Sequence, residues 1–94
     1  IEAQVRNSIQ LLQSARQRII AARAAEAAAR ERLESENRLF QTGESTNFLV
    51  LTRQNDYLEA RLRTVRAQLD YNRAVSRLEQ ATGVTLNTYN SRLR

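Results

Sequence analysis

The sequence predicts an all-α protein, a long antiparallel two-helix coiled-coil hairpin. Of its 94 residues 41% are hydrophobic but only 5% are aromatic, and the chain has no Pro, Cys, Trp or Met. This composition is typical of long helices and coiled coils rather than of a compact globular core. One of the two glycines, Gly43, lies in a short break between two long segments with helical periodicity.

We predict the first helix over about residues 1–41, because nothing in this segment breaks a helix. Its a positions follow a seven-residue spacing and are apolar except for one Glu: Val5, Leu12, Ile19, Glu26, Leu33 and Phe40. Its d positions are mostly small: Ser8, Ala15, Ala22, Ala29 and Glu36. A strict seven-residue repeat predicts a left-handed supercoil against a partner helix.

We predict the second helix over about residues 46–82, after a tip at about residues 42–45. Its expected seam follows the large apolar residues: Phe48, Leu51, Asn55, Leu58, Leu62, Val65 and Leu69, and then Tyr71, Val75 and Leu78. Gly83 is expected to end the helix at its C′ position. The hairpin would therefore span residues 1–86, and residues 87–94 would form a polar tail.

The short break predicts that the two helices are antiparallel neighbours. Folding the chain at Gly43 pairs residues whose numbers add to about 88. The expected pairs are Phe40 with Phe48, Ile19 with Leu69, Ala29 with Leu58 and Ala22 with Val65. Small side chains would then face large ones along the seam.

Apolar residues also lie off the expected seam of the first helix, namely Ile9, Leu11, Ile20 and Leu39, and seven of the nine residues from Ala21 to Ala29 are alanine. Alanine is the best helix former, which accounts for the alanines as well as lateral packing does. The off-seam Ile and Leu side chains favour neighbours on the sides of the hairpin, as in a larger assembly.

Catalytic chemistry has little support in the sequence. Without His or Cys there is no nucleophile–base pair and no imidazole or thiolate metal ligand. We therefore predict no enzymatic activity, no metal and no cofactor. The fifteen basic residues are all Arg, and the stripe Arg16, Arg23 and Arg30 lies at a flanking position where coiled coils carry charge. Acidic residues are interspersed and no aromatic is placed to stack on bases, so we expect no nucleic-acid partner.

The break between the helices has the features of a well-formed turn. Gly43 can adopt positive φ and end the first helix, and Thr46 or Ser45 can cap the second. The run from Phe40 to Thr46, followed by Val50 and Leu51, resembles the hairpin tip of TolC-like outer-membrane efflux proteins. Spaced residues of the second helix match the returning helix of that family: Leu58, Ala60, Ala67, Tyr71, Ala74, Leu78 and Gly83.

This resemblance implies a fragment of a trimeric, periplasmic α-barrel that belongs to an outer-membrane export channel. Tips of the hairpins would dock onto those of a periplasmic adaptor protein, which links the channel to the inner-membrane pump of a tripartite efflux system. The expected adaptor contacts are Thr42, Gly43, Glu44, Ser45, Thr46 and Asn47. Leu49 and Thr52 occupy positions where relatives carry acidic residues around a closed entrance, and they are candidates for an entrance constriction.

A second interpretation comes from a different class of protein. The same periodicity fits a generic coiled-coil hairpin that serves as an interaction or scaffold module, including the arm of a periplasmic adaptor. A scaffold has no need of the Gly-x-x-Thr tip followed by Val-Leu and Tyr-x-x-Ala, and this feature favours the channel.

Overall fold

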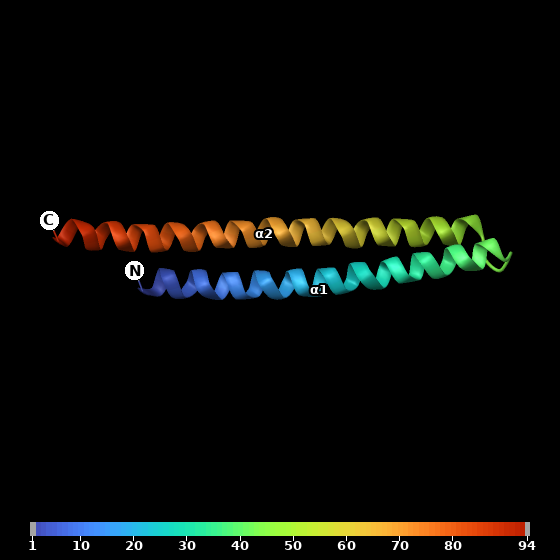
Figure 1. Ribbon diagram of the computed structural model, residues 1–94, viewed down its shortest axis with the longest axis horizontal. Helices are drawn as coiled ribbons and strands as arrows, with labels where there is room; N and C mark the ends of the chain where they lie inside the picture. Colours follow the sequence, from blue (N-terminus) through green and yellow to red (C-terminus); the bar gives the residue numbers. More distant parts are fainter. Residues whose placement is uncertain (1, 94) are drawn as a thin grey trace.

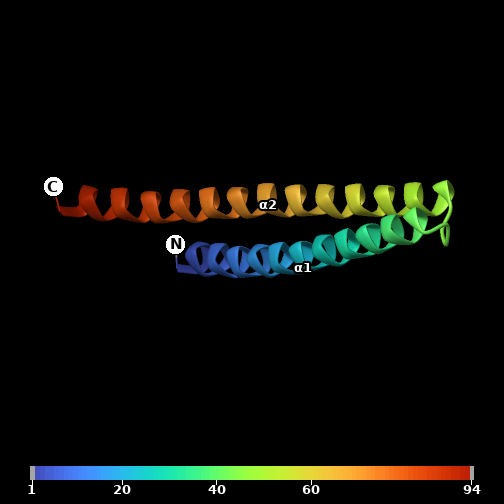
Figure 2. The same ribbon diagram turned by 45° about the vertical axis from the view of Figure 1, so that its right-hand side comes forward.

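The computed structural model describes the backbone of residues 2–93 and the side chains of residues 2–83. Two helices, α1 (Glu2–Gln41) and α2 (Asn47–Leu93), run antiparallel and form a rod of 76 × 14 × 13 Å (Figure 1). They lie side by side from the turn to the start of α1, and α2 extends beyond that point (Figure 2). The structure confirms the all-α two-helix hairpin.

The end of α2 differs from the prediction. The helix continues through Gly83 to Leu93, so the expected stop at Gly83 and the separate tail at residues 87–94 are wrong. Glycine ends a helix when its backbone adopts positive φ, and the only such glycine in the described part is Gly43. In the helical conformation Gly83 only weakens α2, by about 1 kcal/mol relative to Ala, and no Pro follows to stop the chain.

The seam of α1 is the predicted one. Its buried residues are Ser8, Ala15, Ile19, Ala29 and Glu36, and its half-buried residues are Val5, Leu12, Ala22, Glu26 and Leu33. All ten are predicted a or d positions. Phe40, the last a position, is 43% exposed because it lies next to the turn.

The seam of α2 is not the predicted one. The predicted residues from Phe48 to Leu69 are exposed, and the side that faces α1 is smaller and more polar. It repeats every seven residues and comprises Val50, Arg53, Tyr57, Ala60, Thr64, Ala67, Tyr71, Ala74, Leu78 and Ala81, all buried or half-buried. Of the predicted seam, only Tyr71, Val75 and Leu78 are turned toward α1.

Contacts across the seam define the register. Glu36 pairs with Arg53 and Arg30 with Tyr57, so the paired numbers add to 89 and 87, in agreement with the predicted sum. Extended by whole heptads, the first pair places Ala29 opposite Ala60, with further Ala–Ala layers beyond. The predicted pairs Ala29–Leu58, Ala22–Val65, Ile19–Leu69 and Phe40–Phe48 are therefore wrong, since their α2 members are exposed. Small residues that face small residues instead let the two backbones approach and make dispersion contacts along the seam.

Candidate functional site

Gly43 ends α1 at the tip of the hairpin. Its φ is +79°, its N–H donates to the carbonyl of Phe40 at 3.1 Å, and the N–H of Glu44 donates to the carbonyl of Leu39 at 2.7 Å. These two bonds form a Schellman motif, which satisfies carbonyl groups that the helix end leaves free. The expected role of Gly43 as the C′ residue is confirmed.

Thr46 starts α2. Its hydroxyl oxygen accepts the N–H of Leu49 at 3.2 Å, and its carbonyl accepts the N–H of Val50 at 3.1 Å. This is the geometry of an N-cap residue. Of the two predicted candidates Thr46 is therefore the cap, and Ser45 has a different partner.

A buried carboxylate, Glu36, holds the turn against both helices. It is 9% exposed; its Oε2 accepts the hydroxyl of Ser45 at 2.6 Å, and its Oε1 accepts Nε of Arg53 at 3.4 Å. Arg53 also lies 3.8 Å from Asp56. Sequence reasoning missed this anchor because it placed Arg53 outside the seam, although an acidic d position in α1 is itself a sign of a basic partner in α2.

The predicted adaptor contacts lie together at the free end of the rod. Thr42, Gly43, Glu44, Thr46 and Asn47 are exposed, and only Ser45 is half-buried. The hydroxyl of Thr42 lies 3.0 Å from the carbonyl of Leu39 and 3.0 Å from a carboxylate oxygen of Glu44. Apart from Gly43 itself and its two chain neighbours, no heavy atom lies within 4 Å of the place where a Cβ of Gly43 would be, so the backbone here is open to a partner.

The two candidate constriction residues lie one turn into α2. Leu49 is 40% exposed, whereas Thr52 is half-buried and its hydroxyl donates back to the carbonyl of Phe48 at 2.8 Å. Three positions apart, they share one flank of the helix. One hairpin presents a short patch there, and a ring around an entrance requires further copies.

The large apolar residues of α2 form a second seam, which we call the outer stripe: Phe48, Leu51, Asn55, Leu58, Leu62, Val65 and Leu69. Its apolar members are 50% to 75% exposed. The stripe keeps a strict heptad spacing and lies about 150° around α2 from the hairpin seam, at about 103° per residue in a coiled coil. Its exposed area is on the order of 600 Å², the upper end for patches on monomeric proteins.

Tyr57 and Arg30 form the closest polar contact on one flank of the seam. Nη2 of Arg30 donates to the phenolic oxygen at 3.2 Å, and the guanidinium carbon lies 5.7 Å from the ring centroid. The hydrogen bond from Arg30 lowers the pKa of Tyr57 below its ordinary value of 10.0, and Arg61 acts in the same direction. Glu26 lies 3.8 Å from Arg30 and completes this cluster.

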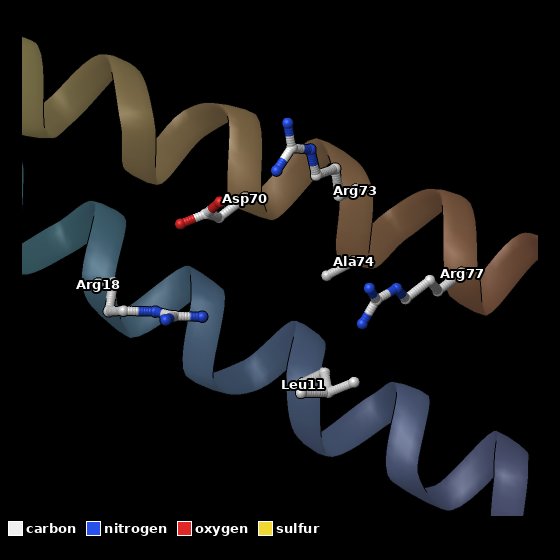
Figure 3. Close-up of a pocket in the computed structure, with 6 residues that line it drawn as sticks. All are labelled: Leu11, Arg18, Asp70, Arg73, Ala74 and Arg77. Atoms are coloured by element: carbon white, nitrogen blue, oxygen red, sulfur yellow. The ribbon is translucent and has the colours of Figure 1, made fainter.

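The opposite flank carries a shallow notch (Figure 3). Arg18, Asp70, Arg73 and Arg77 surround it, above Leu11 and Ala74. The guanidinium group of Arg77 extends toward α1, and the side chain of Arg18 runs along α1. Arginine outnumbers acid here, as it does on the flank of Tyr57.

Within the described residues no group of three His, Cys, Asp or Glu side chains is placed to hold a metal. Neither helix in this part of the chain is long and apolar enough to cross a membrane. The chain matches no protein-family model, and comparisons with curated proteins and with solved structures found no match. The resemblance to TolC-like proteins stays an expectation from the residues of the tip and of the second helix.

Proposed function

We propose that the chain is a periplasmic α-helical hairpin of an outer-membrane export channel and that its tip docks onto a periplasmic adaptor of a tripartite pump. The observation that carries the proposal is the outer stripe, a second heptad seam over residues 48–69 of α2 that the hairpin itself does not use. A hairpin that works alone needs one apolar stripe on each helix. A helix with two seams on nearly opposite sides belongs between two neighbours.

The neighbour that suits the outer stripe is the outer face of α1 in the next hairpin. That face carries Ile20, Ala24 and Ala27, all exposed. With tips level, three facing pairs are apolar, namely Leu62 with Ala27, Val65 with Ala24 and Leu69 with Ile20, whereas Leu51, Asn55 and Leu58 face Arg38, Glu34 and Glu31. The numbers of each pair add to 89, as they do for Glu36 and Arg53, so one register serves both seams.

This contact joins two different surfaces of the hairpin, the outer stripe and the outer face of α1. Such heterologous contacts generate a ring when the rotation between neighbours closes, and an open array when it does not. A closed ring of upright hairpins is an α-barrel. The geometry therefore supports a tubular wall better than a free-standing coiled coil.

The tip suits a docking role for a separate reason. Its shape is fixed by the Schellman motif, the Thr46 cap and the Glu36 anchor, whereas most of its polar side chains are exposed. A preordered end loses little conformational entropy on binding. Small hydroxyl groups and the open backbone of Gly43 allow close approach by another helical tip.

Lateral contact is tested with single-cysteine hairpins, because the natural chain has no cysteine. We expect Val65→Cys and Ala24→Cys chains, mixed and oxidised, to form a mixed disulfide. The matched control is Val65→Cys alone. Efficient disulfide formation between two Val65→Cys chains, with no mixed disulfide between Val65→Cys and Ala24→Cys, would indicate back-to-back pairing of two α2 helices. That result would contradict the ring.

Docking is tested separately with a candidate adaptor hairpin. We expect Glu44→Trp to abolish binding and the exposed, remote Gln17→Trp to preserve it, with both variants fully helical by circular dichroism. Equal binding by both would remove the tip from the interface. In that case the alternative of a generic coiled-coil scaffold would gain, and the parent reading frame would decide, since a channel requires a signal peptide and a second copy of the tip motif.

A further inference from the structure

The hairpin has two flanks, one on each side of the plane that contains both helix axes. In a wall of upright hairpins one flank faces the lumen and the other faces the outside, while the seams between helices are covered. The charges on the two flanks therefore decide which solutes the lumen favours.

The first flank carries four arginines at its own heptad positions against one acidic residue, Glu2 at the start of α1. These arginines are Arg16, Arg23 and Arg30 on α1 and Arg61 on α2, all exposed. Arg30 and Arg61 both approach Tyr57, which shows that the arginines of the two helices share this side. Glu26, from the seam, offsets part of the charge of Arg30.

The second flank is also basic. At the equivalent positions it carries Arg18, Arg32, Arg63 and Arg77 against two acidic residues, Asp56 and Asp70. The notch places Arg18 and Arg77 around Asp70 (Figure 3). Glu59 lies 3.9 Å from Arg63 and Arg73 lines the notch, so this side carries five arginines against three carboxylates.

We infer that the solutes carried by this channel are anionic, bearing carboxylate, phosphate or sulfate groups, and that arginines of one flank line its lumen. This inference rests on the proposed function. Both flanks have an excess of arginine, so the lumen is basic whichever of them faces it. Rings of Arg or Lys select anions in pores, and a narrow passage lined by one sign of charge concentrates the opposite ion.

The test uses the full-length channel that contains this hairpin, purified and inserted into planar bilayers under a potassium chloride gradient. The wild type is expected to conduct chloride in preference to potassium, as measured by its reversal potential. Two matched variants each remove three exposed arginines: Arg16, Arg23 and Arg61 to Gln on the first flank, and Arg18, Arg32 and Arg77 to Gln on the second.

One triple variant is expected to lower the chloride-to-potassium permeability ratio several-fold, and the other to leave it unchanged. The sensitive flank is then the one that lines the lumen. A preference of the wild type for potassium, equal effects of both variants, or no effect of either would overturn the inference while leaving the channel in place. A wild-type protein that forms no pore would refute the proposed function itself, and the inference with it.

Discussion

A pair of opposite substitutions in α2 tests which of its two seams holds the hairpin together. Ala67 is 8% exposed in the hairpin seam, whereas Leu62 is 56% exposed on the outer stripe. We expect Ala67→Leu to destabilise the hairpin, although it adds apolar surface, and Leu62→Ala to leave the stability of the isolated hairpin almost unchanged, although it removes apolar surface.

The magnitudes follow from the geometry. At Ala67 a larger side chain meets the alanine layer of α1, and overpacking of a closely packed seam typically costs about 1–3 kcal/mol. At Leu62 no layer of α1 lies opposite, and surface substitutions of this kind stay within about 0.5 kcal/mol. Truncation of a buried leucine would instead cost about 2–5 kcal/mol.

The assay is urea unfolding followed by circular dichroism, at protein concentrations low enough that the midpoint does not depend on concentration. Ala24→Leu, the same chemical change at an exposed site of α1, controls for the effect of leucine on helix propensity. Leu62→Ala could instead lower the free energy of unfolding by about 2 kcal/mol or more, as truncation of a buried leucine does, while Ala67→Leu leaves it unchanged. That result would show that the large residues form the hairpin seam and would refute the alanine seam.

Three further outcomes are expected. Gly43→Ala should cost about 1–2 kcal/mol in urea unfolding, because alanine resists positive φ and the site is otherwise open; an unchanged midpoint would mean that the turn adopts another backbone conformation. Glu36→Gln and Arg53→Gln should show a coupling energy of about 0.5–3 kcal/mol in a double-mutant cycle, and strictly additive effects would mean that the 3.4 Å contact contributes nothing. The pKa of Tyr57, followed by tyrosinate absorbance against a Tyr57→Phe reference, should lie below 10.0 and rise in Arg30→Gln. Because the folded pKa is lowered, the stabilisation by ionised Tyr57 is fully present above pH 10.0 and is lost as the pH falls through the folded value; a pKa at or above 10.0 in the folded hairpin would contradict the hydrogen bond.

The sequence was sufficient for the fold, for the seam of α1 and for the end of α1 at Gly43, and it narrowed the cap of α2 to Thr46 or Ser45, because each depends on local rules. A strict heptad, a glycine that can adopt positive φ and a threonine at the N-cap position all act within a few residues. The predicted pairing sum also held, since a short turn between antiparallel helices leaves little choice of register.

The seam of α2 could not be predicted in this way, because α2 contains two heptad stripes and only one faces α1. Choosing the larger residues assumed that the hairpin would bury the most apolar surface by itself. The residues that face α1 are instead Ala60, Ala67 and Ala74, because they match the alanines of α1 in size over three layers. Which stripe faces α1 depends on how the two helices fit together, so it cannot be predicted from the sequence of α2 alone.

This arrangement leaves a large apolar surface outside the hairpin. The outer stripe exposes on the order of 600 Å², which corresponds to about 15 kcal/mol at about 25 cal/mol per Å² as an upper value, before the costs of association. That is comparable with the whole free energy of unfolding of a typical domain, about 5–15 kcal/mol. A hairpin with leucines inside and alanines outside would have little apolar surface to offer a neighbour. With alanines inside, the hairpin stays thin and keeps its large side chains for lateral contacts, so its stability should rise steeply with assembly.

The proposed docking at the tip needs the opposite property, a fixed shape before any partner arrives. The Glu36 anchor and the two caps supply that shape locally. In the proposed channel, the hairpin would thus combine a wall that forms by association with an end that is already ordered for docking.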